Sequence, residues 1–440
     1  MDACHKHRVT KSAIQGESMS SNTDSATPQH ERRITDVEII PVAHREPPLR
    51  NSWGAHSELA ARTIVRLTTA DGQVGVGETY GDEKVITALK RASSLVEGMN
   101  PYERKPLELR LQDPMVYGAL ETALLDLIGK TVGEPVYNLL GGKVREEVEY
   151  SGYLFYKYAD TDSTSAAIAP QAVDSAEAMV AEAREFVDEH GFSTLKVKGG
   201  VLNPEEELRT LELLAEEFGR DTPLRIDPNG TWSVETASRI ARRLEESDLR
   251  IQFLEDPVTT MNAHARLKQN MSLPVATNMY VVEFDQIAPA VEMGAVDIIL
   301  SDHHYWSGLT GNVRMNDIAE VFDLGVGMHS NSHLGVSMAA MTHVAAAMSN
   351  VRYACDTHYP WMAEDVIAGG PLEFEDGMMP VSDDPGLGVS LDETELERMN
   401  ERYHDTDPLA YSDVSSMAAE YADAETEVGR SDWLPNKPRW

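Results

Sequence analysis

The sequence has very little cysteine and no long apolar run, and both absences narrow what the protein can be. Only Cys4 and Cys355 occur among the 440 residues, so a disulfide framework and a cysteine metal site are excluded. No segment approaches the roughly 18 uninterrupted apolar residues that a membrane-spanning helix needs, and residues 1–34 lack the apolar core of a secretory signal. We therefore expect a soluble, cytoplasmic protein with no membrane partner.

Lysine is scarce as well, and acidic residues dominate the charge. There are 12 lysines against 26 arginines, and 73 acidic residues against 38 basic ones give a net charge of −35 that is spread along the chain. Such a chain repels nucleic acid and anionic membranes, which excludes them as partners. The magnitude favours a halophilic protein in a very salty cytoplasm, where screening weakens the repulsion between carboxylates. An ordinary acidic protein is the alternative.

Composition and patterning divide the chain into four parts. Residues 1–34 are polar and rich in Ser and Thr, which predicts a disordered tail. Short strands followed by helical periodicity predict a small α+β domain at 35–147. A longer, regular alternation of strands and helices at 148–390 predicts the catalytic domain. For residues 391–440 we expect a C-terminal segment that packs back on the first domain.

The first domain contains three local signals. The segment 63–79 predicts a hairpin that turns at Asp71-Gly72. Apolar residues at i, i+3 and i+4 in 115–142 predict a helix that ends on Gly141-Gly142. Gly75-Val-Gly77 has the wrong spacing for a dinucleotide-binding fingerprint and follows a hairpin strand, so we interpret it as a turn.

The second domain repeats one pattern, an apolar segment followed by an amphipathic, acid-rich helical stretch. Eight such strands alternating with helices form either a (β/α)₈-type barrel or a large doubly wound sheet. Nearly every strand ends in a chemically capable side chain, and barrel active sites lie at the carboxyl ends of the strands, so we predict a TIM-type barrel. The predicted strands span residues 148–154, 194–198, 224–227, 251–255, 274–277, 296–302, 324–330 and 352–356.

Three successive predicted strands end in oxygen-bearing side chains. Asp227, Glu255 and Asn278 supply only hard ligands, which suit Mg²⁺, with Mn²⁺ as an alternative. A single carboxylate at such a position is more often a helix cap or a solvated loop acid. Three ligands in register on neighbouring strands favour a metal site instead.

Two lysines, Lys196 and Lys198, lie on the same side of one predicted strand, because alternate residues of a strand share a face. Their mutual repulsion and their burial lower the pKa of an amine, so we expect one of them to be a neutral base near physiological pH. A strand-end pair that extends to solvent is the alternative, but a chain so poor in lysine has little reason to place two there.

His329 follows an apolar strand, and Asp302 ends the strand before it. A carboxylate beside a histidine fixes its tautomer and raises its basicity, which predicts a second acid–base group across the barrel from the lysines. A base on each side of a metal fits proton abstraction next to a carboxylate, with the metal and the ammonium of Lys196 stabilising the enediolate.

Several segments around these residues resemble the glucarate dehydratases of the enolase superfamily. The helix segment ALETALLDLIGK resembles part of that family's capping domain. The resemblance implies a (β/α)₇β TIM-type barrel with an N-terminal α+β capping domain. It also implies loss of water from an aldarate to give a 2-keto-3-deoxy product, with D-glucarate as the expected substrate. The segments are FSTLKVKGGVL (192–202), IDPNGTW (226–232), LEDP (254–257), VATNM (275–279), VDIILSDHHYW (296–306), MHSNSHLGVSMAAMTHVAAA (328–347) and DTHYPW (356–361).

The resemblance also implies individual roles. Lys198 would be the base on one face of the substrate, and Lys196 would contact the substrate carboxylate. His329 with Asp302 would be the opposite base and the acid that protonates the departing hydroxyl. Glu255 is favoured as second metal ligand, because this chain has no acid slightly further along, where the family can have one. The substrate-binding positions would be His56, Tyr153, Lys196, Asn229, Ser330, Asn331 and His358.

The sequence departs from the family where the far end of the substrate is recognised. The family's substrate-binding Thr has no counterpart, Leu107 being nearest, and Tyr411-Ser412-Asp413 lacks the family's Arg before a paired acid. A galactarate or aldonate dehydratase, an acid-sugar epimerase with the same two bases, and a non-catalytic acid-sugar-binding homologue therefore stay open. We expect a small-molecule sugar acid as the ligand and a homo-oligomer, since such barrels often form symmetric assemblies.

Overall fold

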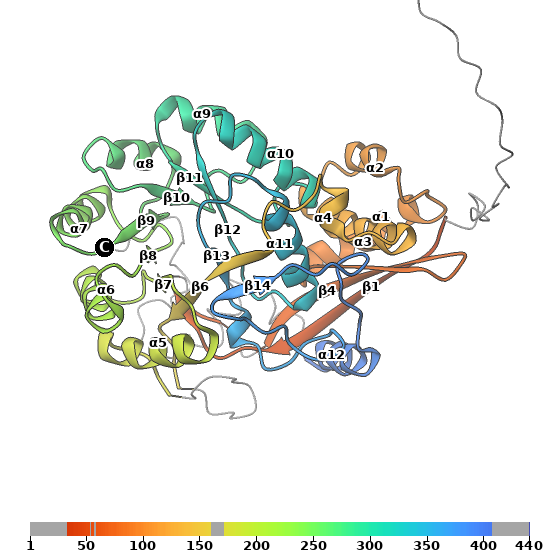
Figure 1. The fold of residues 1–440 in the computed structure, drawn as a ribbon, viewed down its shortest axis with the longest axis horizontal. Helices are drawn as coiled ribbons and strands as arrows, with labels where there is room; N and C mark the ends of the chain where they lie inside the picture. Colours follow the sequence, from red (N-terminus) through yellow and green to blue (C-terminus); the bar gives the residue numbers. More distant parts are fainter. Residues whose placement is uncertain (1–32, 53, 57–58, 160–170, 407–439) are drawn as a thin grey trace, which may run out of the picture.

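The computed structural model describes residues 33–52, 54–56, 59–159, 171–406 and 440. Nearly all of the predicted tail at 1–34, and most of the predicted C-terminal segment at 391–440, lie outside the described residues. Within them, an antiparallel sheet with its helices lies beside a curled parallel sheet ringed by helices (Figure 1). In these ranges, every helix is too short or too polar to cross a membrane.

The first sheet has three long strands in the order β1-β4-β5. All pairs are antiparallel, and the predicted hairpin is confirmed: β4 and β5 are joined by a turn through Asp71-Gly72, with Gly72 at a φ of +82°. The helices of this region pack against the sheet. The bounds are β1 Ile34–Arg45, β4 Leu59–Thr69, β5 Val74–Tyr80, α1 Glu83–Val96, α2 Arg104–Leu111 and α3 Pro114–Val132, with a small ribbon of β2 Arg50–Asn51 and β3 Gly54–Ala55.

Gly75 and Gly77 lie inside β5, so our interpretation of them as a turn is wrong. A Cβ atom at Gly75 would come within 2.3 Å of the carbonyl oxygen of Ala123, and one at Gly77 within 2.4 Å of the carbonyl oxygen of Ala119. The two glycines therefore allow helix α3 to lie directly on the strand.

Helix α3 is shorter than the sequence pattern predicted. It ends before Gly133, which adopts the left-handed conformation with a φ of +74°. A separate short helix, α4 (Val136–Leu139), follows, and the pair Gly141-Gly142 comes after that one. Both helices bury apolar side chains, so the apolar periodicity continued across the break and hid it.

The second sheet is the predicted barrel. Eight parallel strands follow one another in the order β13-β6-β7-β8-β9-β10-β11-β12, and β12 contacts β13. In the described part of the chain each strand from β6 to β12 is followed by one helix, and α5 to α10 run around the outside (Figure 1). The strands are β6 Glu147–Phe155, β7 Leu195–Lys198, β8 Leu224–Asp227, β9 Ile251–Glu255, β10 Val275–Thr277, β11 Ile298–Ser301, β12 Gly325–Met328 and β13 Cys355–Thr357. The helices are α5 Ala176–His190, α6 Pro204–Phe218, α7 Val234–Glu246, α8 Met261–Lys268, α9 Phe284–Met293, α10 Gly308–Val321 and α11 Gly335–Ala347.

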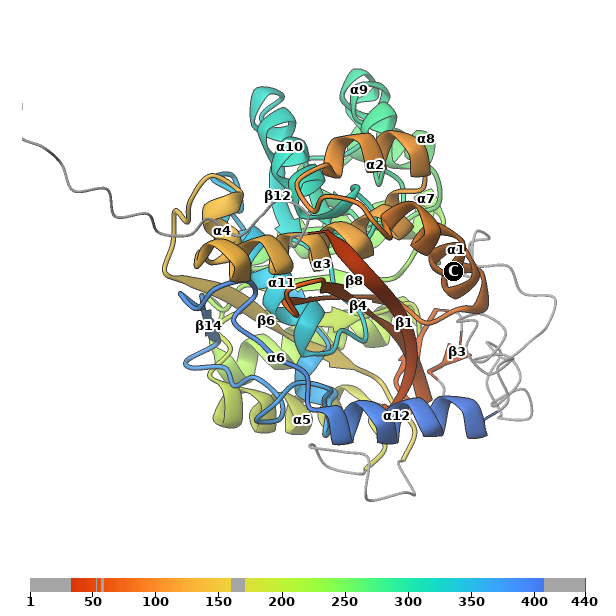
Figure 2. The same cartoon turned by 90° about the vertical axis from the view of Figure 1, so that its right-hand side faces the viewer.

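The end of the described chain returns to the first sheet. After the short helix η1 (Tyr359–Trp361) and strand β14 (Met378–Pro380), which pairs with β6, helix α12 (Glu393–Asp405) lies beside β1 (Figure 2). The Asn400 side chain donates to the Pro41 carbonyl over 2.6 Å. Trp440 instead contacts the loop after β8, where its backbone N–H donates to the Thr231 carbonyl over 2.9 Å.

Candidate active site

The parallel register of the barrel brings the predicted chemical side chains to one end of the sheet. Lys198 lies directly opposite Asp227 where β7 pairs with β8, and Glu255 lies opposite Ala276 where β9 pairs with β10. Because parallel strands all point the same way, their carboxyl ends meet at one rim. We call the buried cluster that results the lysine side; it comprises Lys196, Lys198, Asp227, Glu255, Asn278 and Asp356.

Each lysine of this side is paired with its own carboxylates. The Lys196 Nζ atom lies 2.5 Å from Glu255 Oε2 and 2.5 Å from Asp356 Oδ2. The Lys198 Nζ atom lies 2.6 Å from Asp227 Oδ2. All of these partners come from barrel strands, and the two ammonium groups are held by different carboxylates.

These pairings bear on the charge of Lys196, which we expected to act as an ammonium. Burial disfavours the ammonium form of Lys196, but the negative charges of Asp356 and Glu255 outweigh burial and raise the pKa of Lys196 above its ordinary value. The neighbouring carboxylates therefore outweigh the burial that would favour a neutral Lys196. The charged form of Lys196 is thus favoured, in agreement with the expected ammonium.

The predicted metal ligands supply a donor set that fits a hard divalent cation. Asp227, Glu255 and Asn278 are buried and offer only oxygen ligands, and the Asn278 amide donates to Glu255 Oε1 over 3.2 Å. Burial and the charges of Asp227 and Asp356 raise the pKa of Glu255 well above its ordinary value despite the nearby lysine. Negative charge is thus crowded here, and a bound cation would offset it.

The other acid of the LEDP segment has a different task. Asp256 accepts the Thr277 hydroxyl over 2.5 Å and the Asn278 backbone N–H over 2.9 Å. These bonds hold the start of the loop after β10 in place. Glu255 is the acid of this segment that faces Lys196, in keeping with its choice as the second metal ligand.

Two predicted substrate-binding residues also contact the lysine side. The Tyr153 hydroxyl donates to Asp227 Oδ2 over 3.3 Å, and the Lys196 Nζ atom lies 4.3 Å from the centre of the tyrosine ring. The Asn229 amide donates to the same carboxylate oxygen over 3.3 Å, and its backbone N–H reaches the other oxygen over 2.9 Å. Both residues therefore orient Asp227 in this structure.

The second predicted base is held by a carboxylate, as expected. His329 Nδ1 lies 3.0 Å from Asp302 Oδ2, and His304 Nδ1 lies 2.7 Å from the other oxygen. Burial alone would raise the pKa of Asp302, but the histidines that face it, His304 above all, lower that pKa well below its ordinary value. We call this cluster the histidine side; it comprises Arg62, His304, Asp302 and His329.

The loop after His329 holds two further predicted residues. Ser330 is buried, and its hydroxyl has no hydrogen-bond partner among the described residues. The Asn331 amide is bound by the first domain instead: it donates to the Tyr80 hydroxyl over 2.8 Å and accepts from Arg62 Nη1 over 3.3 Å. The structure therefore leaves Ser330 with the more available polar group.

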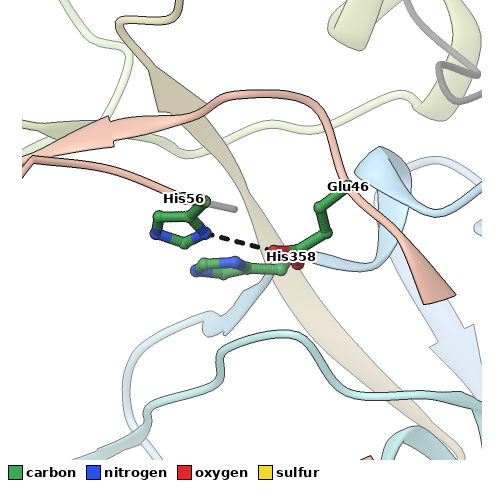
Figure 3. A group of neighbouring side chains, drawn as sticks. All are labelled: Glu46, His56 and His358. Carbon is green, nitrogen blue, oxygen red and sulfur yellow. Dashed lines mark hydrogen bonds and ion pairs between the residues drawn. The ribbon is translucent and has the colours of Figure 1, made fainter. Parts of the chain in front are cut away.

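His56 and His358 lie together with an acid that we did not predict. Figure 3 shows the two rings one above the other and the hydrogen bond that joins the His56 ring to the Glu46 carboxylate. The centres of the two rings are 6.0 Å apart. His56 Nδ1 lies 3.1 Å from Glu46 Oε2. Burial opposes ionisation of Glu46, but the hydrogen bond and charge of His56 lower its pKa to about 2. The first domain thus adds an acid–histidine pair to this end of the barrel.

His358 lies between residues of the first domain and of the barrel, with its ring centre 6.0 Å from that of His56 and 5.1 Å from that of Tyr153. It is 5% exposed, and burial lowers its pKa well below the ordinary value, with the positive charges of His56, Lys198 and His329 adding to the effect against the opposing charge of Glu46. One imidazole is therefore within electrostatic reach of both predicted bases and of the first domain.

Four residues at the site were not predicted from the sequence, and only two of them lie in segments that the sequence analysis had identified. Asp356 lies in a predicted strand, and His304 follows Asp302 by two positions, so both were within segments already identified. Glu46 and Arg62 belong to the first domain, and no local pattern links them to the barrel. Only the contact between the two domains reveals their part in the site.

The family model described as "Enolase C-terminal domain-like" matches residues 178–395. A probable glucarate dehydratase from Streptomyces coelicolor is 41% identical over 443 residues, which cover 92% of this chain and 99% of that protein.

Two solved structures are similar over almost the whole chain. An enolase from Gibberella zeae, complexed with magnesium, formate and sulfate, has a TM-score of 0.86 and 36% identity, and covers 93% of this chain and 98% of its own. An enolase from Pseudomonas fluorescens with bound magnesium, potassium and tartrate has a TM-score of 0.83 and 37% identity. The match covers 93% of this chain and 99% of that one.

Proposed function

This chain belongs to the enolase superfamily, and from that premise we propose that it is a Mg²⁺-dependent acid-sugar dehydratase with D-glucarate as its substrate. Such a carbon–oxygen lyase removes the proton next to a carboxylate and expels the hydroxyl group from the adjacent carbon. The product is a 2-keto-3-deoxy sugar acid. Similarity to a probable glucarate dehydratase supports the choice of substrate.

One observation carries the proposal: two differently built acid–base pairs lie at the carboxyl ends of the barrel strands, at one end of the sheet. On one side Lys198 lies 2.6 Å from Asp227, and on the other His329 lies 3.0 Å from Asp302. His358 is within electrostatic reach of both. Proton transfer at a carbon next to a carboxylate needs this combination of a base and charge stabilisation.

The charge stabilisation has two sources in this proposal. Asp227, Glu255 and Asn278 would hold Mg²⁺, or Mn²⁺ in its place, as the magnesium in two similar structures supports. When bound, the cation supplies a Lewis acid for the negative charge that develops on the substrate carboxylate. Lys196, kept as an ammonium by Glu255 and Asp356, would add a fixed positive charge beside that carboxylate.

Lys198 and His329 would transfer the protons on opposite faces of the substrate. Asp302 holds the Nδ1 side of His329, which leaves Nε2 to accept the α-proton or, as imidazolium, to give a proton to the departing hydroxyl. The electron pair of the broken C–H bond forms the carbon–carbon double bond, and the hydroxyl leaves as water. The enol that remains becomes the ketone.

The remaining predicted residues would bind the acid sugar. His56 and His358 offer imidazole nitrogens where the first domain meets the barrel, and Ser330 offers a buried hydroxyl. Tyr153 and Asn229 would act partly through Asp227, which they contact. Asn331 would complete the set once its bonds to the first domain adjust.

The proposal also covers the salt environment, the domain boundaries and the assembly of the enzyme. A net charge of −35 supports a halophilic protein of a salty cytoplasm that takes part in the breakdown of carbohydrate acids. We propose a capping domain at 35–147, a catalytic barrel at 148–390 and a homo-oligomeric assembly. The contact of α12 with β1 supports a return of the segment from 391 onward to the capping domain.

A substrate panel tests the proposal. The purified protein is incubated with D-glucarate, galactarate and five- and six-carbon aldonates in molar KCl with Mg²⁺, and 2-keto product is measured. We expect D-glucarate to react fastest and exhaustive EDTA treatment to stop the reaction. A faster galactarate or aldonate would change the substrate alone, and an inverted sugar acid without keto product would indicate an epimerase. Tight binding with no reaction and no proton exchange would sink the dehydratase proposal.

A further inference from the structure

Asp302 serves two histidines at once. Its Oδ2 atom faces His329 Nδ1 at 3.0 Å, and its Oδ1 atom faces His304 Nδ1 at 2.7 Å and accepts the His304 backbone N–H over 2.9 Å. Asp302 and His304 are both fully buried. The carboxylate that orients the proposed base is therefore itself held from the other side.

The proton positions in this chain follow from Arg62. The Arg62 Nη2 group can only donate, and it lies 3.3 Å from His304 Nε2, so this nitrogen accepts. A neutral His304 then carries its proton on Nδ1 and donates it to Asp302. Two N–H groups, from His304 and His329, thus point at one carboxylate, which keeps the His329 proton on Nδ1 and leaves Nε2 free for substrate.

Arg62 belongs to β4 of the first domain, and its buried side chain is held by an acid. It is 1% exposed, and its Nε atom donates to Glu78 Oε1 over 2.8 Å. Glu78 also accepts the backbone N–H groups of Leu334 and Ser337, over 2.9 Å and 2.7 Å, at the beginning of α11. An acid at a helix N-terminus is favourable, so this contact joins the first domain firmly to the loop that follows His329.

We propose that Arg62 and His304 are positioning residues for His329, so that contact with the first domain sets the geometry and tautomer of one proposed base and not of the other. Lys198 differs, because its ammonium group is paired with Asp227, which belongs to the barrel. The inference rests on the proposed function, since it concerns residues behind a proposed base.

Two isosteric variants separate the hydrogen bonds of His304. The amide nitrogen of Asn takes the place of Nδ1, and the amide of Gln takes the place of Nε2. His304→Asn can still donate to Asp302, whereas His304→Gln can still bond Arg62 but cannot donate to Asp302. His333→Gln is the matched control, because His333 is equally buried nearby and its ring nitrogens have no hydrogen-bond partner among the described residues.

The readout is α-proton exchange with D₂O, followed by NMR on epimeric sugar acids whose α-proton faces either Lys198 or His329. For His304→Gln we expect exchange at the His329 face to fall about 10- to 100-fold while exchange at the Lys198 face is kept. His304→Asn should retain most of the exchange at the His329 face. A variant that merely misfolds or loses the metal has slower exchange at both faces, so exchange at the Lys198 face is an internal control. If His304→Gln does not fold, Arg62→Lys replaces it, since a lysine cannot reach both Glu78 and His304, and we expect the same face-selective loss.

The outcomes separate this inference from the proposed function. Wild-type exchange at both faces, with His304→Gln equal to wild type or to His333→Gln, overturns the inference alone. Equal losses at the His329 face in His304→Asn and His304→Gln also overturn it, because the donated proton would then not matter. A wild-type protein that exchanges no α-proton overturns the proposed function, and the inference falls with it.

Discussion

The two sides of the site are built from different physics. On the lysine side, charged groups neutralise one another at short range, as in the 2.5 Å contacts of Lys196 with Glu255 and Asp356. On the histidine side, a hydrogen-bonded chain leads from Arg62 through His304 to Asp302, with a longest contact of 3.3 Å. The first arrangement comes from barrel strands alone, and the second crosses from one domain to the other.

This difference predicts how each side fails. Buried opposite charges depend strongly on each other, because the loss of one leaves the other unpaired in a medium of low polarity. A chain of hydrogen bonds loses orientation first, and charge balance is affected less. We therefore expect changes on the lysine side to affect stability and metal binding, and changes at His304 and His329 to affect turnover with little loss of stability.

The largest expected effect separates the two proposed bases. His329→Asn removes a base and the acid for the departing hydroxyl, so dehydration of every epimer should fall about 100- to 10,000-fold, together with exchange at that face. Lys198→Met should lose dehydration as well, but slow α-proton exchange should persist on substrates whose proton faces His329. NMR of the α-proton in D₂O measures both. Identical behaviour of the two variants would mean that the sides are not two independent bases.

The next effect concerns stability on the lysine side. Lys196→Met removes the ammonium that Glu255 and Asp356 share and leaves Asp356 only its 3.5 Å contact with Arg225, so without metal the free energy of unfolding should fall by about 3–5 kcal/mol. Lys105→Met is the control, because Lys105 makes the same kind of contact with Glu108, at 2.5 Å, on an exposed helix. For Lys105→Met we expect the free energy of unfolding to fall by only about 0–1 kcal/mol. Urea unfolding in EDTA compares them, and equal losses would show that the buried pairing adds nothing.

Metal binding should depend on one side only. At a Mg²⁺ concentration 100 times the dissociation constant, the cation should stabilise the wild-type fold by about 2.7 kcal/mol. Asp227→Asn should abolish this gain, whereas His329→Asn should keep it. Thermal unfolding with and without Mg²⁺ is the measurement. A gain that survives in Asp227→Asn would place the cation elsewhere.

The smallest effect tests the helix that follows the histidine side. His343 in α11 accepts the Tyr137 backbone N–H over 3.3 Å and lies 3.2 Å from the Leu387 carbonyl. Burial lowers its pKa from 6.5 to about 4, so the unfolded chain takes up a proton at a higher pH than the folded one. Its contribution to stability is complete above pH 6.5 and is lost as the pH falls toward 4.

As the pH falls from 7.5 to 5, protonation of His343 in the unfolded chain should lower the free energy of unfolding of the wild-type protein by about 2 kcal/mol. His343→Gln should flatten that part of the stability curve, and the exposed His404→Gln should not. Urea unfolding across the pH range gives the slopes. An unchanged slope in His343→Gln would assign the acid sensitivity to other buried groups.

The sequence anticipated some elements well and others poorly for identifiable reasons. All eight barrel strands and the hairpin at Asp71-Gly72 were predicted, because alternation and turn residues are local signals. The end of α3 at Gly133 was missed, since apolar periodicity continued into α4. The part of Asp356 in holding the Lys196 ammonium was also missed, because the two residues lie 160 positions apart.

Sequence alone determined the chemistry available at the strand ends: which carboxylates, lysines and histidines stand at the rim follows from strand spacing and from the parallel direction of the strands. Only the tertiary structure decided how those groups are charged and held. Asp356 reaches Lys196 across 160 positions, and Arg62 reaches His304 across 242. A pKa and a tautomer depend on distances of a few ångströms between such remote residues, and no local pattern of the chain records those distances.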